Sequence, residues 1–469
     1  MKFLERTEMK RIVFWFIVVV ISISMVSAFG LSGCKQTAAE ETTAAAEETT
    51  AAEEAGIKPP EGEVKLTWWA QDWPGGVKWM DSYKKYIEEK YPNITLDMVY
   101  TDISPQKVFP ALIAGTGPDI MHGYTHFITP AQDVTKLFLK VTPDLGTLEE
   151  IRNISYVDAI GKLVGNDGEL YGVPMGTGTN EGGMVYNIAL TEEAGINMDD
   201  VKTLDDLFEA AKKLTTYDDA GNIVRSGVSW MGGNTPQYFF DLITTYGGYD
   251  KVYNPKTGEW NCNIPEAKKA LEFMQAYVDA KIFDPTSGDN QQAFPNELCA
   301  MYPLGPWASA IYKDSFPDLK IGFWPFPKGT RVAAADAWGV FYASNKLEGE
   351  KKQATLFIFD NVLRDPMYYD LGIDPNTGGW SGIPGSSLFI KYLEDKKSKG
   401  EDLTEQQQFI LNFGSQYEAK ALLFAQDWAT ITPIVYDEII KSWKGEVTQD
   451  EALTNMTQKL NEAEKTVRQ

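Results

Sequence analysis

The chain has 469 residues, which is more than one hydrophobic core usually supports, and its 43% hydrophobic content is ordinary for a globular protein. These values favour two α/β lobes. Nucleic-acid binding needs clustered Lys and Arg, so a formal net charge of −23 argues against a nucleic-acid partner.

The first 33 residues have the features of a signal peptide. Two basic residues precede the apolar run Ile12–Ile21, and small residues follow up to Leu31-Ser32-Gly33-Cys34. These last four residues resemble the cleavage site of bacterial lipoproteins, in which the cysteine thiol receives a diacylglyceryl group. On that resemblance we expect residues 1–33 to be removed and Cys34 to anchor the protein to the cell membrane. The alternative is an uncleaved anchor over residues 12–29, which approaches the roughly 20 residues of a bilayer span.

Residues 34–62 are expected to form a disordered tether. Thr37 to Glu54 is a run of Thr, Ala and paired Glu with no apolar face, and it is followed by Lys58-Pro59-Pro60. A tether of this kind keeps an anchored domain near its membrane partner and so raises its effective concentration there.

Strands and helices alternate from residue 64 onward. Strands are predicted at 64–69, 94–100 and 120–121, and helices at 77–91, 106–114, 204–214 and 265–282. Capping boxes are predicted at Thr203 with Asp206 and at Thr448 with Glu451. This alternation is typical of mostly parallel sheets covered by helices on both faces.

Two further features have alternative interpretations. Asp219–Asn222 is predicted to be a hairpin turn, and a calcium loop is the less favoured reading because the 12-residue ligand spacing is absent. Cys262 and Cys299 are the only cysteines after Cys34. We expect two buried free thiols, although the sequence leaves a disulfide between them open.

Several blocks resemble the family of extracellular solute-binding proteins of sugar ABC importers, the group that includes maltose-binding protein. The most specific are Leu112–Ile120, which contains Gly-Thr-Gly-Pro-Asp, and Asp167–Pro174 followed by Met184–Asn187. Weaker matches are Thr191–Ile196, Met301–Trp307, Pro325–Pro327 and Gly445–Leu453. The resemblance covers nearly all of residues 63–465, and Asn296–Cys299 departs from the family's pattern.

The resemblance implies an α/β, two-lobed, periplasmic-binding-protein-like (type II) fold, with mixed sheets flanked by helices and a ligand cleft between the lobes. Residues 63–178 and 335–380 would form lobe 1, and residues 179–334 and 381–469 lobe 2. It also implies a monomer that binds a carbohydrate, most simply an oligosaccharide, and delivers it to the membrane subunits of an ABC permease. No cofactor, metal or enzymatic activity is expected.

A sugar presents hydroxyl edges and apolar C–H faces, so its receptor needs aromatic platforms and planar hydrogen-bonding groups in a concave site. The chain has 13 tryptophans, several of them beside glycines or in predicted turns. The candidate ligand contacts are Gln71, Asp72, Trp73, His122, Tyr124, Glu181, Trp230, Asn234, Trp307, Trp338 and Trp380. The alternatives are core tryptophans that cover strand ends and carboxylates that are simply solvated.

Rival functions also follow from the residues. Two loop carboxylates in a sugar site could make a secreted glycosidase or polysaccharide lyase. A sugar sensor could use the same fold without transport. His122 and His126 could share a metal, and Tyr368-Tyr369 is similar to the tyrosine pair of ferric-binding relatives, but a glycine between the histidines favours a loop over a shared helix face.

Overall fold

The computed structural model describes most of the chain from residue 56 onward. The described ranges are 56–124, 127–128, 136–155, 160, 163–177, 183–233, 235–287, 292–305, 308–312, 315–327, 339–374, 383–384, 386–416 and 428–468. The predicted signal peptide, the lipidation site Cys34 and tether residues 34–55 lie outside these ranges.

The last residues of the predicted tether are held by the fold. The backbone N–H of Ile57 donates to an Asp360 carboxylate oxygen at 3.2 Å, and the Asn93 side chain donates to the carbonyls of Pro60 and Gly62 at 2.7 and 3.0 Å. The backbone of residues 57–62 therefore has partners on the folded domain, while the bounds of the tether stay a prediction.

The first sheet has five strands in the order β2-β1-β3-β13-β4. They are β1 (Val64–Gln71), β2 (Ile94–Thr101), β3 (Ile120–Gly123), β4 (Val173–Pro174) and β13 (Val340–Ala343). β1 runs parallel to β2 and β3, whereas β13 runs antiparallel to β3 and β4. The sheet is mixed, and a strand from the last third of the chain lies between strands from the first half.

Among the described residues, seven helices accompany this sheet in the first apolar core. They are α2 (Pro74–Lys90), α3 (Pro105–Ala114), α4 (Leu148–Ile154), α11 (Gly349–Arg364), α12 (Pro366–Ile373), α13 (Ser387–Ser398) and α14 (Glu405–Gln416). Trp68, Tyr83, Tyr368 and Phe341 form a closed ring of edge-to-face contacts at its centre. Each such pair is worth about 0.5 to 1.5 kcal/mol beyond the area it buries.

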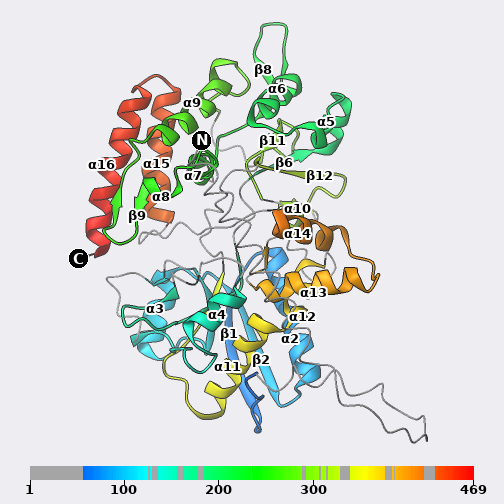
Figure 1. The fold of residues 1–469 in the computed structure, drawn as a ribbon, viewed down its shortest axis with the longest axis vertical. Coiled ribbons are helices and arrows are strands. Elements are labelled where there is room, and N and C mark those ends of the chain that lie inside the picture. The colour runs from blue at the N-terminus through cyan, green and yellow to red at the C-terminus, as the bar shows by residue number, and fades with distance from the viewer. Residues whose placement is uncertain are drawn as a thin grey trace, which may run out of the picture. The chain divides into compact units, whose positions relative to one another are not determined.

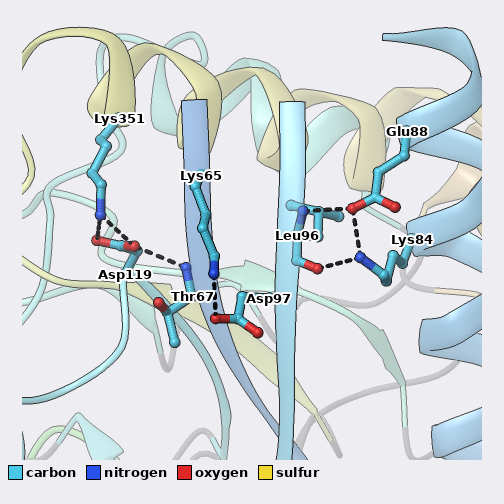
Figure 2. Close-up of polar contacts among 8 residues, drawn as sticks. All are labelled: Lys65, Thr67, Lys84, Glu88, Leu96, Asp97, Asp119 and Lys351. Carbon is cyan, nitrogen blue, oxygen red and sulfur yellow. Dashed lines mark hydrogen bonds and ion pairs between the residues drawn. The ribbon is translucent and has the colours of Figure 1, made fainter. Parts of the chain in front are cut away.

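Polar contacts fix the strands of this sheet to the helices around it (Figure 2). The Asp119 carboxylate, just before β3, accepts from the Thr67 backbone N–H at 2.8 Å and from the Lys351 ammonium of α11 at 2.8 Å. On β2, the backbone of Leu96 is bonded through its N–H to Glu88 and through its carbonyl to Lys84, both on α2. Asp119 belongs to a block that carries the family resemblance, and it joins β1, β3 and α11.

The second sheet also has five strands, in the order β12-β6-β11-β8-β7. They are β6 (Gly183–Asn187), β7 (Thr216–Tyr217), β8 (Ile223–Val228), β11 (Cys299–Tyr302) and β12 (Ile321–Pro325). β8 and β11 are parallel, and the other neighbours are antiparallel. Two small ladders complete the strands, namely β5 (Gly176–Thr177) with β14 (Ile383–Pro384) and β9 (Tyr253–Asn254) with β10 (Glu259–Trp260).

The helices of the second core come from the middle and the end of the chain. They are α5 (Ile188–Glu193), a 3-10 turn (Met198–Asp200), α6 (Leu204–Leu214), α7 (Thr235–Thr245), α8 (Tyr249–Val252), α9 (Pro265–Asp279), α15 (Trp428–Trp443) and α16 (Gln449–Arg468), while α10 (Ala308–Tyr312) packs in a smaller cluster with β11. Figure 1 shows the C-terminal helix α16 beside α15, with α9 next to both.

A buried carboxylate joins α15 to α16. The side chain of Glu438 is fully buried, and it accepts from Lys441 at 2.9 Å, Lys459 at 2.7 Å and Asn455 at 2.9 Å. Burial alone would raise the pKa of Glu438, but the hydrogen bonds from Lys459, Lys441 and Asn455 outweigh it and lower that pKa to about 2. The charged form of Glu438 therefore stabilises the packing of the C-terminal helices.

Packing assigns α13 and α14 to the first core. Phe389 and Leu393 of α13 and Ile410 and Leu411 of α14 are buried in the first cluster, whereas α15 and α16 bury their apolar residues in the second. The predicted division placed all of residues 381–469 in lobe 2. This packing favours a boundary between residues 416 and 428 instead. The sequence did not reveal it, because the amphipathic pattern of a helix does not indicate which sheet the helix covers.

The predicted local signals are mostly present. Both capping boxes form, with Thr203 and Thr448 as N-caps. In the predicted hairpin turn, the Asp218 carboxylate accepts from the N–H groups of Ala220 and Asn222. Cys262 and Cys299 are buried free thiols, as expected, and burial raises the pKa of Cys262 to about 12. α2 begins at Pro74, three residues before the predicted start, because proline is well tolerated in the first turn.

Candidate functional site

The carboxyl ends of parallel strands bring two groups of predicted contacts to one edge of the first sheet. Trp68 and Trp69 of β1 lie opposite Ile120 and Met121 of β3. In this parallel register Gln71 ends β1 beside the end of β3, which contains His122 and Gly123, and the residues that follow, Asp72 and Trp73 on one strand and Tyr124 on the other, leave the sheet at the same edge. Ligands of open α/β sheets bind at such strand ends.

The same edge contains two residues that the sequence did not single out as contacts. Val340 of β13 lies opposite both Gly123 and Pro174, and the backbone N–H of Met175 donates to the carbonyl of Gly339 at 2.9 Å. Met175 and Gly339 thus lie next to each other. Their position in the sequence was the signal that could have identified them, because both residues lie close to a predicted lobe boundary, at residues 178/179 and 334/335.

His122 is the buried titratable group of this edge. Its side chain is 5% exposed, and within the described ranges its Nε2 atom has no hydrogen-bond partner. Burial lowers the pKa of His122 to about 4, so the imidazole is neutral at physiological pH. Gly339 has a φ of +97°, and a Cβ there would lie 2.9 Å from His122 Nε2 and 2.8 Å from Met175 Sδ. The absence of a side chain at residue 339 makes room for both.

The other predicted contacts of this edge are more open. Asp72 is exposed, while Gln71, Trp73 and Tyr124 are half-buried. Trp73 has an extended backbone and is the N-cap residue of α2. The Tyr124 ring lies 6.1 Å from the His122 ring, and the Tyr342 hydroxyl donates to the Tyr124 carbonyl at 2.8 Å. Carboxylate, amide and aromatic groups are therefore present together, as a carbohydrate site requires.

A matching edge is formed in the second sheet. The parallel strands β8 and β11 end there at Val228 and Tyr302, where the antiparallel strand β6 begins and β12 ends, with Gly183 opposite Pro325. Met175 and residue 183 are joined by residues 176–182, and β12 leads into the segment that returns to Gly339. The chain itself therefore connects this edge to the edge that contains His122.

Trp230 follows β8 at this second edge but is packed inside. It is fully buried and makes edge contacts with Tyr277 at 5.5 Å and Phe273 at 6.2 Å between ring centroids. This packing fits the alternative that Trp230 is a core tryptophan covering a strand end. Its contact with a ligand stays an untested prediction.

Five predicted contacts lie outside the described residues, as does His126. They are Glu181, Asn234, Trp307, Trp338 and Trp380. Their contact with a ligand remains a prediction.

The metal alternative finds no support among the described residues. No group of three His, Cys, Asp or Glu side chains lies close enough there to hold an ion. Tyr368 is fully buried in the aromatic ring of the first core and Tyr369 is 1% exposed beside it. Both tyrosines of the pair serve packing.

The fold is similar to that of known sugar receptors. The ABC substrate-binding protein of Listeria monocytogenes in complex with cycloalternan matches with a TM-score of 0.63 and 20% identity, covering 85% of this chain and 98% of that chain. At this identity the likeness shows the fold alone. The protein therefore has the two-lobed type II fold of α/β class, with mixed sheets flanked by helices, that the sequence predicts.

Residues 78–369 match the model of the bacterial extracellular solute-binding protein family, and the chain belongs to this family. An uncharacterized ABC transporter extracellular-binding protein of Pyrococcus horikoshii is 26% identical over 288 residues, which are 58% of this chain and 62% of the relative. An arabinooligosaccharide-binding protein of Bacillus subtilis is 26% identical over 287 residues, 57% of this chain and 61% of the relative. The chain thus spans about three fifths of the length of the curated relatives it matches.

Family membership agrees with the expected extracytoplasmic location. Within the ranges that the structure describes, no helix is both long and apolar enough to cross a membrane.

Proposed function

We propose that this protein is the substrate-binding lipoprotein of an ABC importer, which captures a carbohydrate between its two lobes and delivers it to the permease. The observation that carries the proposal is the family match over residues 78–369. The two sheet edges support it, because they are joined by short connections and one of them gathers Gln71, Asp72, Trp73 and His122. These groups suit a neutral, hydroxyl-rich ligand better than an ion.

The ligand class we propose is an oligosaccharide. One curated relative is named for binding arabinooligosaccharides, and a structural neighbour holds cycloalternan. Several aromatic side chains could each stack on one sugar unit of an oligosaccharide, since every sugar ring has an apolar face. We propose no catalytic role for the protein, so the ligand should be recovered unchanged after binding.

A thermal-shift screen tests this proposal. The purified domain is melted with arabinotriose, maltotriose, mannotriose and their monosaccharides, and a ligand at 100 times its dissociation constant adds about 2.7 kcal/mol of stability. We expect one oligosaccharide to raise the melting temperature, with chromatography showing no product after incubation. Shortened products would favour the glycosidase, and no shift with any sugar would contradict carbohydrate capture.

Site variants then locate the contacts. Trp307→Ala and Trp380→Ala should each weaken binding at least about tenfold, or about 1.4 kcal/mol, because each removes a stacking platform. Asp72→Asn should cost less, since the amide keeps one acceptor for a sugar hydroxyl. Calorimetry with the best oligosaccharide of the screen measures all three variants. Wild-type affinity in both tryptophan variants would place these side chains away from the ligand.

The membrane anchor has its own test. We expect Cys34 to carry the lipid and residues 1–33 to be absent from the mature protein, and Cys34→Ala should lack the lipid. Mass spectrometry of the membrane fraction decides the matter. A peptide from upstream of residue 34 in the mature protein would instead indicate a transmembrane anchor.

A further inference from the structure

Helix α2 begins with two glycines that its backbone does not require. The sequence at its start is Pro74-Gly75-Gly76, and glycine is among the weakest helix formers. Neither Gly75 nor Gly76 is among the glycines with a positive φ, so an alanine could adopt the same backbone conformation at either position. The two glycines are therefore explained by the side chain that lies against them, not by the backbone.

That space is filled by the indole of Trp73. A Cβ on Gly75 would lie 2.4 Å from Trp73 Cζ3, and a Cβ on Gly76 would lie 2.2 Å from Trp73 Nε1. For both glycines, the three atoms nearest to this position all belong to the Trp73 ring system. The six-membered ring covers Gly75 and the nitrogen-bearing ring covers Gly76, so the indole lies across the first turn of its own helix.

Trp73 held in this way still presents groups to its surroundings. Its side chain is half-buried, and it packs on the edge of the first core. In the part of the chain that the structure describes, its indole N–H has no acceptor and is not among the polar atoms shielded from solvent. An indole with a fixed plane and an open N–H can stack on a sugar and donate to one of its hydroxyls.

We propose that Gly75 and Gly76 are positioning residues for carbohydrate binding, which form a seat without side chains that holds the Trp73 indole in the orientation that receives the ligand. This inference rests on the proposed function. Rings that are fixed before binding lose little freedom when the ligand arrives, so a seated tryptophan binds more tightly than one that moves. An added methyl at either glycine would lift the ring from its seat.

The first test does not need a ligand. Fluorotryptophan is incorporated into the protein, and the fluorine NMR signal of Trp73 is assigned by its loss in Trp73→Phe. We expect Gly75→Ala and Gly76→Ala to shift that signal, while Lys85→Ala, on an exposed part of the same helix, leaves it in place. An unmoved Trp73 signal in both glycine variants would overturn the seat, whatever the protein binds.

The second test measures binding with the best oligosaccharide of the thermal-shift panel. Gly75→Ala and Gly76→Ala should each weaken affinity at least about fivefold, while circular dichroism shows both variants folded because alanine favours the helix. In a Trp73→Ala background, the same glycine substitutions should weaken affinity no further.

The outcomes separate the two ideas. Unchanged affinity in the glycine variants, or an equal loss with and without Trp73, would overturn the positioning role while leaving sugar capture intact. No binding of any panel sugar by the wild type would be a failure of the proposed function, and the NMR result would still decide whether the seat exists.

Discussion

Acid should destabilise this protein through one buried histidine. Burial lowers the pKa of His122 in the native state to about 4, whereas in the unfolded chain the imidazole has its ordinary pKa of 6.5. The stability associated with the neutral form is fully present above pH 6.5 and is lost as the pH falls toward 4. A pKa lowered from 6.5 to about 4 corresponds to at most about 3 kcal/mol of stability, most of which is lost by about pH 4.5.

His122→Phe isolates this contribution. Phenylalanine keeps a flat ring beside Phe341, whose centroid lies 6.0 Å from the imidazole, and it does not titrate. Urea unfolding followed by circular dichroism at about pH 7 and about pH 4.5 should show a fall in unfolding free energy that is about 2 kcal/mol smaller in the variant. His126→Phe is the matched control, since His126 is the only other histidine. Parallel falls in wild type and His122→Phe would refute the assignment.

Substitutions at three further residues, Gly339, Glu438 and Asp119, test the packing around the site and the lobes, with Gly168→Ala as a control. Gly339→Ala should lower the unfolding free energy by about 2 to 3 kcal/mol, because its Cβ would crowd Met175 at a φ of +97°. Gly168→Ala, at a φ of +81° with open space around it, should cost about 1 kcal/mol. Equal losses in the two variants would contradict the crowding. Glu438→Gln should cost about 2 kcal/mol at neutral pH, a loss that shrinks as the pH falls from 4.5 toward 2, where the native carboxylate is protonated in the wild type too. Asp119→Ala should cost about 2 kcal/mol because it leaves the Thr67 N–H unpaired, and Asp119→Asn about half as much; denaturant unfolding measures each.

The sequence predicted the helices and turns better than it predicted which of them pack together. Capping boxes at Thr203 and Thr448 and the turn at Asp218 act over a few residues, so their chemistry is legible in the sequence. The assignment of α13 and α14 to the first core depends on contacts with residues far away in the chain. An apolar stripe shows that a helix covers something, and the choice between two sheets is left to tertiary packing.

The candidate contacts show the same limit. Gln71, Asp72 and Trp73 could be placed at a strand end because the strand before them is strongly apolar, and the parallel register brings His122 to the same edge. Trp230 has a similar sequence setting, yet Phe273 and Tyr277 of α9 enclose it. No pattern near residue 230 indicates that a helix some forty residues later packs on it.

The connections between the sheets determine how the two edges can cooperate. In the first sheet, the connecting segments leave from neighbouring strands, β4 and β13, with Met175 bonded to Gly339. In the second sheet they also reach neighbouring strands, β6 and β12, where Gly183 lies opposite Pro325. Both segments are therefore fixed side by side at each end. A third connection runs from α14 of the first core to α15 of the second, so any rotation of one lobe on the other would have to be absorbed by these three connections together.

The length of the shorter connection limits the distance between the edges. From Pro174 to Gly183 the chain can span at most about 30 Å when fully extended, at about 3.3 to 3.6 Å per residue. If the proposed oligosaccharide rests on Trp73, it is never far from the second edge, and a contact there would be nearly intramolecular once the first had formed. Substitutions at the two edges should accordingly be non-additive in their effect on affinity, because they act on one bound molecule.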